Sequence, residues 1–451
     1  MNHIRVFFAS LAFLGVLWPV ISWAAPRAAG RAASVLHRGK PLKNCTGKGS
    51  VSFMFWGDKG EYVEQTSLIQ EAEKACPGLK VTGIWKQNGY DEALATGIGS
   101  GNAPDLFLLD TKRLPEYASQ SALQPLASYI SRDRLDLKKY FWTNCLPLTM
   151  YRKVVYGLER DCGNNGMLIY NKDMFNARHV GYPTNNWSYS AFARAAQRLT
   201  GTYTTRTDPA QQARFGTPIL TDDPHLVQYL WAWGADWMSA DLHRCTLTSA
   251  SARSALQWWH DLAYKSHGAA TPQQLASVGG SSAGFTNQRL AMEFVGPWAL
   301  DYLLKPSGYT RNSPVKFRWG VALPPRGTRS GDGPLISAVV AMYKGAKNKR
   351  AAWWLLKFLT LGASTSILGT YGIAIPGDKR AANSAAFAAE YKPYTATWLA
   401  GQKRGRWMRI VPQEDAWWAA VTGALDPFWR NSTSVQSATA SACSTASSYL
   451  P

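Results

Sequence analysis

The chain has 451 residues, of which 46% are hydrophobic and 17% charged. Its length exceeds what one hydrophobic core usually supports and predicts two domains, and its composition excludes an intrinsically disordered chain. The formal net charge is +20, a value that can attract nucleic acid, anionic lipid or an acidic ligand. Because the basic residues are scattered along the chain, we favour a general surface property and expect no nucleic-acid partner.

The N-terminus has the features of a cleaved secretory signal. Arg5 gives a positive start, residues 6–21 are mostly apolar, and the small residue Ala24 follows. We place the cleavage after Ala24 and expect residues 25–47 to form a flexible lead-in. A membrane anchor is the alternative interpretation, but Pro19 interrupts the apolar run. The sequence therefore predicts an exported protein of the periplasm.

Export would allow the cysteines to form disulfides. The chain contains Cys45, Cys76, Cys145, Cys162, Cys245 and Cys443. Six cysteines permit fifteen pairings, and the sequence does not choose among them. Proximity along the chain favours Cys45 with Cys76 and Cys145 with Cys162. No Cys-x-x-Cys motif occurs, so we expect neither a zinc site nor a redox motif, and no cofactor.

The first third of the chain alternates strands and helices. We predict strands over 51–56, 80–85 and 106–109, with a helix that ends before Pro77 and a second over 91–98. This alternation is typical of a doubly wound α/β domain, in which ligands bind at the carboxyl ends of the strands. These ends carry Trp56, Asp58, Lys59 and Asp110.

The remainder of the chain is mainly helical in pattern. Helices are expected over 188–200, 224–239, 250–265, 285–303, 347–361 and 414–426. Two strand-like runs return late, over 319–323 and 335–343. Strand-rich sequence on both sides of a helical middle indicates two lobes built from discontinuous parts of the chain.

Several motifs follow one another in an order found in one family. They are Gly57-Asp58-Lys59-Gly60, GNAPDLFLLD at 101–110, LIYNKD at 168–173 followed by Trp187, RLAMEFVGPW at 289–298, and the segments 320–324 and 371–376. Together they cover most of residues 50–430. In this order the sequence resembles the sugar-binding extracellular solute-binding proteins of ABC importers, a family that includes the maltose-binding proteins.

The resemblance implies a periplasmic-binding-protein-like α/β fold, with two lobes joined by hinge segments and a ligand cleft between them. Lobe one would comprise 48–162 plus 319–372, and lobe two 163–318 plus 373–451. It also implies a monomeric receptor that closes on a mono- or oligosaccharide and delivers it to the permease subunits of an inner-membrane importer. No chemistry on the ligand is expected.

The strand ends and the resemblance together imply a set of ligand-binding residues. They are Trp56, Asp58, Lys59, Asp110, Arg113, Asn164, Asp223, His225, Trp298, Trp417 and Trp418. Carboxylates accept from sugar hydroxyls, ammonium groups donate to them, and tryptophan faces pack on the apolar face of a sugar ring.

Structural roles remain alternatives for several of these residues. Asp58 and Lys59 could form an exposed turn, and Asp223 could cap a helix before Pro224. One of Trp417 and Trp418 could line the cleft while the other packs in the core. Asn164 stands where the family has a glutamate, and Val421 where it has an arginine, so the ligand need not be maltose.

Two other functions compete with a neutral sugar receptor. The same fold could bind an anion such as a sugar phosphate, a uronate or a glycerol phosphodiester through Lys59, Arg113 and His225, although the abundance of tryptophan favours a neutral sugar. Alternatively, Ser282 lies in a Gly-x-Ser-x-Gly pattern at 280–284, the nucleophile turn of many hydrolases. That turn requires a preceding strand, which residues 273–279 do not predict.

Overall fold

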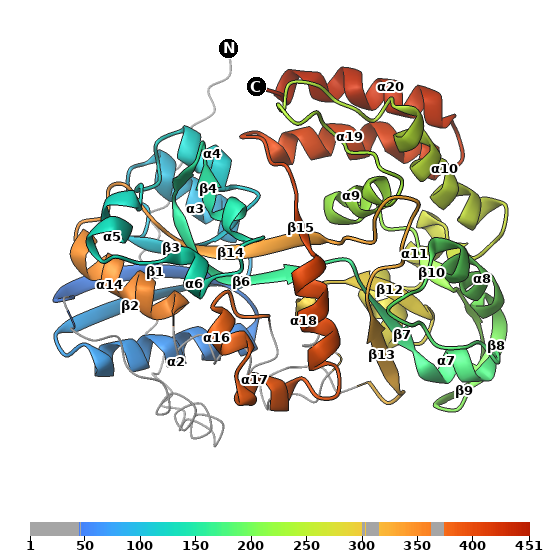
Figure 1. Cartoon of the computed structure of the whole chain (residues 1–451), viewed down its shortest axis with the longest axis horizontal. Coiled ribbons are helices and arrows are strands. Elements are labelled where there is room, and N and C mark those ends of the chain that lie inside the picture. Colours follow the sequence, from blue (N-terminus) through green and yellow to red (C-terminus); the bar gives the residue numbers. More distant parts are fainter. Residues whose placement is uncertain (1–44, 46, 300–302, 304–314, 362–373) are drawn as a thin grey trace, which may run out of the picture.

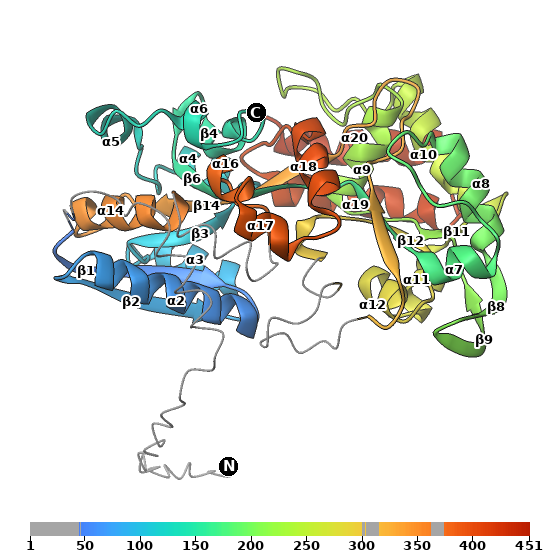
Figure 2. The same cartoon turned by 60° about the horizontal axis from the view of Figure 1, so that its bottom comes forward.

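The computed structural model describes residues 45, 47–299, 303, 315–361 and 374–451. The predicted signal peptide and all of the lead-in before Cys45 lie outside these residues. The described chain forms two α/β parts joined by the long strands β6 and β14 (Figure 1). Helices α16, α17 and α18 lie between the two parts in both views (Figures 1 and 2).

The first part is built on a mixed sheet. Its strands are β1 (Gly49–Trp56), β2 (Leu79–Lys86), β3 (Leu106–Asp110), β6 (Gly157–Asn164), β14 (Pro334–Met342) and β15 (Arg406–Trp407). Strands β2, β1 and β3 are parallel, whereas β14 runs antiparallel to both β3 and β6. The three strands expected from the sequence at this end are confirmed, and the carboxyl ends of β1 and β3 meet at one edge.

Strand β1 explains how this sheet is buried on both faces. Phe53 and Phe55 pack in one apolar cluster with α2 (Lys59–Ala75) and α14 (Lys349–Thr360). The intervening Met54 packs in a second cluster with α3 (Tyr90–Gly99) and α4 (Leu114–Ser119). Because successive side chains of a strand point to opposite faces, this apolar run needs helices on both sides.

The second part contains a smaller antiparallel sheet in the order β12–β7–β13. Its strands are β7 (Met167–Asn171), β12 (Met292–Val295) and β13 (Trp319–Ala322). Strand β7 follows β6 after only Asn165 and Gly166, so the chain passes directly from one sheet to the other. Strand β13 of this sheet is followed along the chain by β14 of the first sheet, so a second connection leads back from the second part to the first.

Helices and short strands complete both parts. Those of the first part are α3 (Tyr90–Gly99), α4 (Leu114–Ser119), α5 (Ala127–Arg132), α6 (Leu137–Tyr140), β4 (Met150–Tyr151) and β5 (Val154–Val155). Those of the second part are α7 (Lys172–Ala177), α8 (Tyr189–Leu199), β8 (Gly201–Thr205), β9 (Asp208–Arg214), β10 (Thr217–Pro218), α9 (Asp223–Ala232), α10 (Ala250–Tyr264), β11 (Ala269–Ala270), α11 (Pro272–Ser277), α12 (Ser281–Thr286), α19 (Glu414–Trp429) and α20 (Val435–Ala446). Between the parts lie α16 (Lys379–Ala382), α17 (Ala385–Glu390) and α18 (Thr395–Arg404).

The structure corrects two expectations from the sequence. The helix expected over 285–303 is wrong, because residues 292–295 form β12 and Pro297–Ala299 form a short 3-10 helix. Met292 to Val295 are fully buried and pair with β7, so sheet pairing overrides the helical pattern. Residues 319–322 pair with β7 as well. They therefore belong to the second sheet, whereas the predicted division placed them in lobe one.

Three disulfides connect the cysteines. Cys45 bonds to Cys76, and Cys145 bonds to Cys162, as chain proximity favoured. The third joins Cys245 to Cys443 and so ties α20 to the loop after α9. Within the described residues, no helix is both long and apolar enough to cross a membrane.

Candidate functional site

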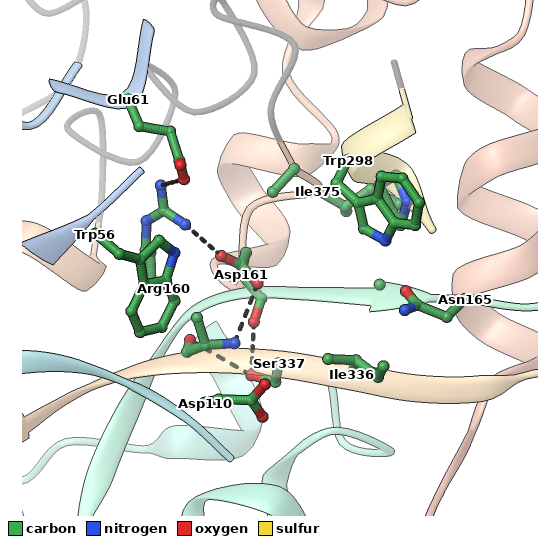
Figure 3. A pocket seen from close by; sticks show the side chains of 14 residues that line it. Trp56, Glu61, Asp110, Arg160, Asp161, Asn165, Trp298, Ile336, Ser337 and Ile375 are labelled. Atoms are coloured by element: carbon green, nitrogen blue, oxygen red, sulfur yellow. Dashed lines mark hydrogen bonds and ion pairs between the residues drawn. The ribbon is translucent and has the colours of Figure 1, made fainter. Parts of the chain in front are cut away.

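A cavity of about 170 Å³ lies where β6 and β14 cross between the two parts. Its wall on the first part comes from Trp56, Glu61 and Asp110, and its wall on the second part from Asn165, Pro297 and Trp298. The lining is completed by Arg160, Asp161, Gly163, Ile336, Ser337, Ala338, Ala374 and Ile375. Figure 3 shows Trp56 and Trp298 on opposite sides of this space.

The first wall results from the strand order of the mixed sheet. Trp56 ends β1 and Asp110 ends β3, and the parallel pairing of these strands brings both residues to the same edge. The Trp56 ring packs edge-on against Tyr90, with 5.0 Å between ring centroids. Asp110 accepts a hydrogen bond from the backbone N–H of Lys112 at 2.9 Å. Burial raises the pKa of Asp110, although the nearby Lys112 ammonium acts against this rise.

The second wall depends on a close approach of the backbone at Gly296. A Cβ at this position would lie 2.1 Å from the Asn165 side-chain oxygen and 2.5 Å from the Trp298 indole nitrogen. Only glycine therefore allows the chain after β12 to bring Trp298 against Asn165. Trp298 retains 44% of its surface exposed, which is unusual for so large an apolar side chain.

The floor of the cavity carries one guanidinium among several carboxylates. Arg160 on β6 is 4% exposed and forms ion pairs with Asp161 at 2.8 Å, Glu64 at 3.2 Å and Glu61 at 3.3 Å. Asp161 also accepts a hydrogen bond from the backbone N–H of Ala338 at 3.1 Å. The two crossing strands therefore fix this carboxylate in place.

Burial controls the ionisation of this cluster. It raises the pKa of Glu64 to about 7, although the Arg160 guanidinium acts in the opposite direction. Burial also raises the pKa values of Glu61 and Asp161, and Arg160 again opposes the rise. The three carboxylates thus share one guanidinium, and burial favours their protonated forms.

The turn after β1 has a structural role in this structure. The Asp58 carboxylate caps α2 by accepting from the backbone N–H groups of Gly60 at 2.6 Å and Glu61 at 3.1 Å. Lys59 is the first residue of α2 and is exposed. Neither residue lines the cavity, and Glu61 of the same helix does so instead.

Asn164 and His225 are buried and have protein partners for their polar atoms. The Asn164 amide donates to the carbonyl of Gly401 at 2.9 Å and accepts from the N–H of Gly166 at 2.8 Å. His225 contacts the Asp222 carboxylate at 2.7 Å and the carbonyl of Phe294 at 3.0 Å. The next residue after Asn164, Asn165, lines the cavity.

Two cation–carboxylate pairs join the first part to the second. Lys112 lies 2.9 Å from Asp223, which is the first residue of α9 rather than its N-cap. Arg113 lies 2.7 Å from Asp415 on α19 and 3.4 Å from Asp91. Both cations follow β3. Arg113 and Asp223, which were expected to bind the ligand, thus take part in pairs that connect the two parts.

The paired tryptophans on α19 belong to the core. Trp417 is 0% exposed and Trp418 is 6% exposed, and the Trp418 indole donates to the Glu414 carboxylate at 2.7 Å. The alternative in which one of the pair lines the cleft is not found for this cavity. Of the residues expected from the sequence, the cavity brings together Trp56, Asp110 and Trp298.

The structure gives little support to the two competing functions, a hydrolase that uses Ser282 and a receptor for an anionic ligand. Ser282 lies in α12, and within the described residues 272–286 it is preceded by α11 and a loop rather than by a strand. The cations proposed for an anionic ligand lie elsewhere, since Lys59 and Arg113 do not line the cavity and His225 is occupied.

Several cavity residues escaped prediction from the sequence. These are Glu61, Arg160, Asp161 and Asn165, together with the backbone around Ser337. A signal for them does exist in the sequence. Glu159, Arg160 and Asp161 are three consecutive charged residues inside a largely buried strand. Charged side chains are almost never fully buried unless they have partners.

The comparisons with known proteins agree with this architecture. Residues 61–361 match the family described as bacterial extracellular solute-binding protein. A Brucella abortus (strain 2308) sequence described as a binding protein is 24% identical over 314 residues, covering 66% of this chain and 68% of that protein.

Solved structures show the same fold. An ABC substrate-binding protein of Listeria monocytogenes in complex with cycloalternan has a TM-score of 0.76 at 20% identity, covering 89% of this chain and 98% of its own. The maltose/maltodextrin-binding domain from Bdellovibrio bacteriovorus bound to maltotriose has a TM-score of 0.70 at 18% identity, with coverages of 89% and 99%.

Proposed function

The chain belongs to the family of bacterial extracellular solute-binding proteins, and from this premise we propose that it is the sugar-capturing receptor of an ABC importer. Its ligand would be a mono- or oligosaccharide bound in the cavity between Trp56 and Trp298. The structural relatives named above carry oligosaccharides, which supports the same ligand class for this chain.

The observation that carries this proposal is the composition of the cavity. Two tryptophans lie on opposite sides of a space that is also lined by carboxylates, a guanidinium and an amide. Aromatic faces suit the apolar C–H face of a sugar ring, and the polar groups suit its hydroxyls. This combination of a few placed polar groups with aromatic walls is typical of a small-molecule site.

The position of the cavity supports capture by closure. Trp56 and Asp110 belong to the first part, whereas Asn165 and Trp298 belong to the second. A ligand in contact with both walls would bind the closed arrangement better than an open one and would shift the population toward closure. The closed protein would then dock on the permease subunits of the importer in the inner membrane.

Export and a monomeric state complete the proposal. The family is extracellular, and the N-terminal sequence has the pattern of a cleaved signal, so we place the mature protein in the periplasm. No chemistry on the ligand is proposed. An affinity near 1 μM would correspond to about −8 kcal/mol, which stacking and a few hydrogen bonds can supply after the costs of ordering.

A thermal-shift screen of the mature protein tests this function directly. The panel contains neutral sugars, amino sugars, sugar phosphates and uronates. A ligand of the native state raises the melting temperature in proportion to the logarithm of its concentration above Kd, so at least one sugar should raise it in a saturable way. Absence of any shift across the panel at millimolar concentration would overturn the sugar assignment.

A further inference from the structure

The charges around the cavity differ in sign from those of the protein as a whole. The chain has a formal net charge of +20, yet the ionisable residues that line the cavity are Glu61, Asp110 and Asp161 against the single cation Arg160. Glu64 lies directly behind them and pairs with the same guanidinium at 3.2 Å. A negative site in a strongly basic protein is not explained by the general composition.

Two further cations of the described chain near the cavity are already paired. Lys112 lies 2.9 Å from Asp223, and Arg113 lies 2.7 Å from Asp415. Among the described residues that line the cavity, Arg160 is the only cation. Carboxylates therefore outnumber cations in the described part of the lining, although Lys112 also lies near Asp110.

One carboxylate of the cavity lining retains acceptor capacity for a ligand atom. Asp110 accepts from Lys112 through one oxygen, which leaves acceptor capacity on the other.

The aromatic walls favour a positive charge as well. Trp56 and Trp298 lie on opposite sides of the carboxylates (Figure 3). Tryptophan faces attract cations, and an ammonium group beside both an indole face and a carboxylate gains from each.

The volume limits how much of a ligand this site encloses. A cavity of about 150 Å³ takes up one benzene ring, and the cavity here measures about 170 Å³. The cavity is therefore comparable to the space that one small ring occupies, and the further rings of a longer saccharide would extend outside it.

We infer that this cavity selects a sugar ring that carries a protonated amine. The ammonium group lies against Asp110 and the Glu61–Asp161 carboxylates, and the ring packs between Trp56 and Trp298. This inference rests on the proposed function and specifies its ligand class as an amino sugar rather than a neutral or anionic one.

The first test compares glucosamine, N-acetylglucosamine, glucose and glucuronate by isothermal titration with the full mature protein at pH 6.5 and low salt. Acetylation removes the positive charge while it retains the ring and its nitrogen. We expect glucosamine to bind at least about tenfold more tightly than each of the other three, since paired charges in a desolvated site discriminate strongly. Increasing the salt concentration should reduce this preference.

The second test removes one carboxylate charge at a time. Asp110→Asn retains an oxygen that can accept from the Lys112 N–H and should lower the ratio of glucosamine to glucose affinity by about tenfold. Glu61→Gln, on another element, should lower the same ratio. Glu92→Gln is the matched control, because Glu92 is exposed on α3 and does not line the cavity.

The outcomes separate this inference from the function on which it rests. Glucose or N-acetylglucosamine binding as tightly as glucosamine would overturn the amine preference and leave the sugar receptor standing. Preferential binding of glucuronate would overturn it in favour of an anion site. An equal loss of the affinity ratio in Glu92→Gln would show a general field effect and also overturn it. If no sugar in the thermal-shift panel binds, the proposed function and this inference both fail.

Discussion

Lys112, in the turn after β3, forms an ion pair of 2.9 Å with Asp223 at the start of α9. This pair joins the two parts of the molecule beside the cavity, and both side chains are largely shielded from water, with 25% and 13% exposed. The proximity of Asp110 and Asp223 raises the pKa of Lys112, although burial alone would lower it. The pair therefore contributes to the arrangement of the two parts.

Replacing Lys112 by Met should weaken this connection. The change leaves the Asp223 carboxylate part-buried without its partner, so we expect the free energy of unfolding to fall by about 1–3 kcal/mol. Denaturant unfolding measures the loss, and small-angle scattering should show a larger radius of gyration if the parts separate. Lys74→Met is the control, because the Lys74–Glu71 pair lies on the surface of α2 and should change stability by less than about 1 kcal/mol. Equal losses in both variants would contradict the role of Lys112.

Trp298→Ala should reduce sugar affinity more than stability. The ring is 44% exposed, so its removal leaves no large internal void, whereas loss of a stacking surface should cost about 1–3 kcal/mol of binding. Titration calorimetry with the sugar identified in the thermal-shift screen measures this cost.

Trp417→Ala serves as the comparison, since Trp417 is 0% exposed in the core and its loss should destabilise the fold by about 3–5 kcal/mol. Unchanged binding by the Trp298 variant would remove this ring from the site.

Glu293 should make stability depend on pH. It is 2% exposed, and burial raises its pKa to about 7, although the hydrogen bond from Ser281 and the nearby His225 act against the rise. An acid with a higher pKa in the folded state contributes stability that is full below its unfolded pKa of about 4.5 and is lost as the pH rises through about 7.

Glu293→Gln should therefore lose less unfolding free energy between pH 5 and pH 8 than the parent protein, by on the order of 1–3 kcal/mol. Chemical denaturation at the two pH values provides the comparison. Glu92→Gln, which changes an exposed glutamate on α3, should follow the parent. A fall of the same size in all three proteins would refute the assignment to Glu293.

The disulfide between Cys245 and Cys443 should contribute more to stability than the one between Cys45 and Cys76. It closes a separation of 198 residues, against 31 for the other, and the loss of chain entropy in the unfolded state grows with this length. Removing it by paired Cys→Ala changes should cost about 2–5 kcal/mol, measured by denaturant unfolding. Limited proteolysis should then cut near α20 first. A larger loss from the Cys45–Cys76 pair would contradict this order.

The sequence predicted the first sheet well because its strands are marked locally. Val51, Phe53 and Phe55 are buried on one face of β1 and Met54 on the other, so an unbroken apolar run identifies the strand without knowledge of its partners. The segment 285–303 has no such marker. Its strand exists because β7 lies beside it, and that pairing is a property of the tertiary structure.

The candidate site was predictable at the strand ends and much less so at the crossing strands. Trp56 and Asp110 line the cavity because parallel strands end together, a rule that the sequence pattern can use. Arg160 lines it because three carboxylates from two elements surround its guanidinium. The spacing of residues along the sequence does not reveal that these carboxylates surround the Arg160 guanidinium. Asn164 ends β6 and does not line the cavity, whereas the next residue, Asn165, does.

The Cys145–Cys162 disulfide fixes β6 close to the point where it leaves the first sheet. Cys162 lies one residue beyond Asp161 and three residues before Asn165, so the pivot of any rotation along this connection is confined to the short stretch Gly163–Gly166. Arg160 and Asp161 precede this stretch and Trp298 belongs to the second part, so in the proposed closure they would lie on opposite sides of the pivot. The disulfide would thereby determine which wall of the cavity stays with the first part in the proposed closure.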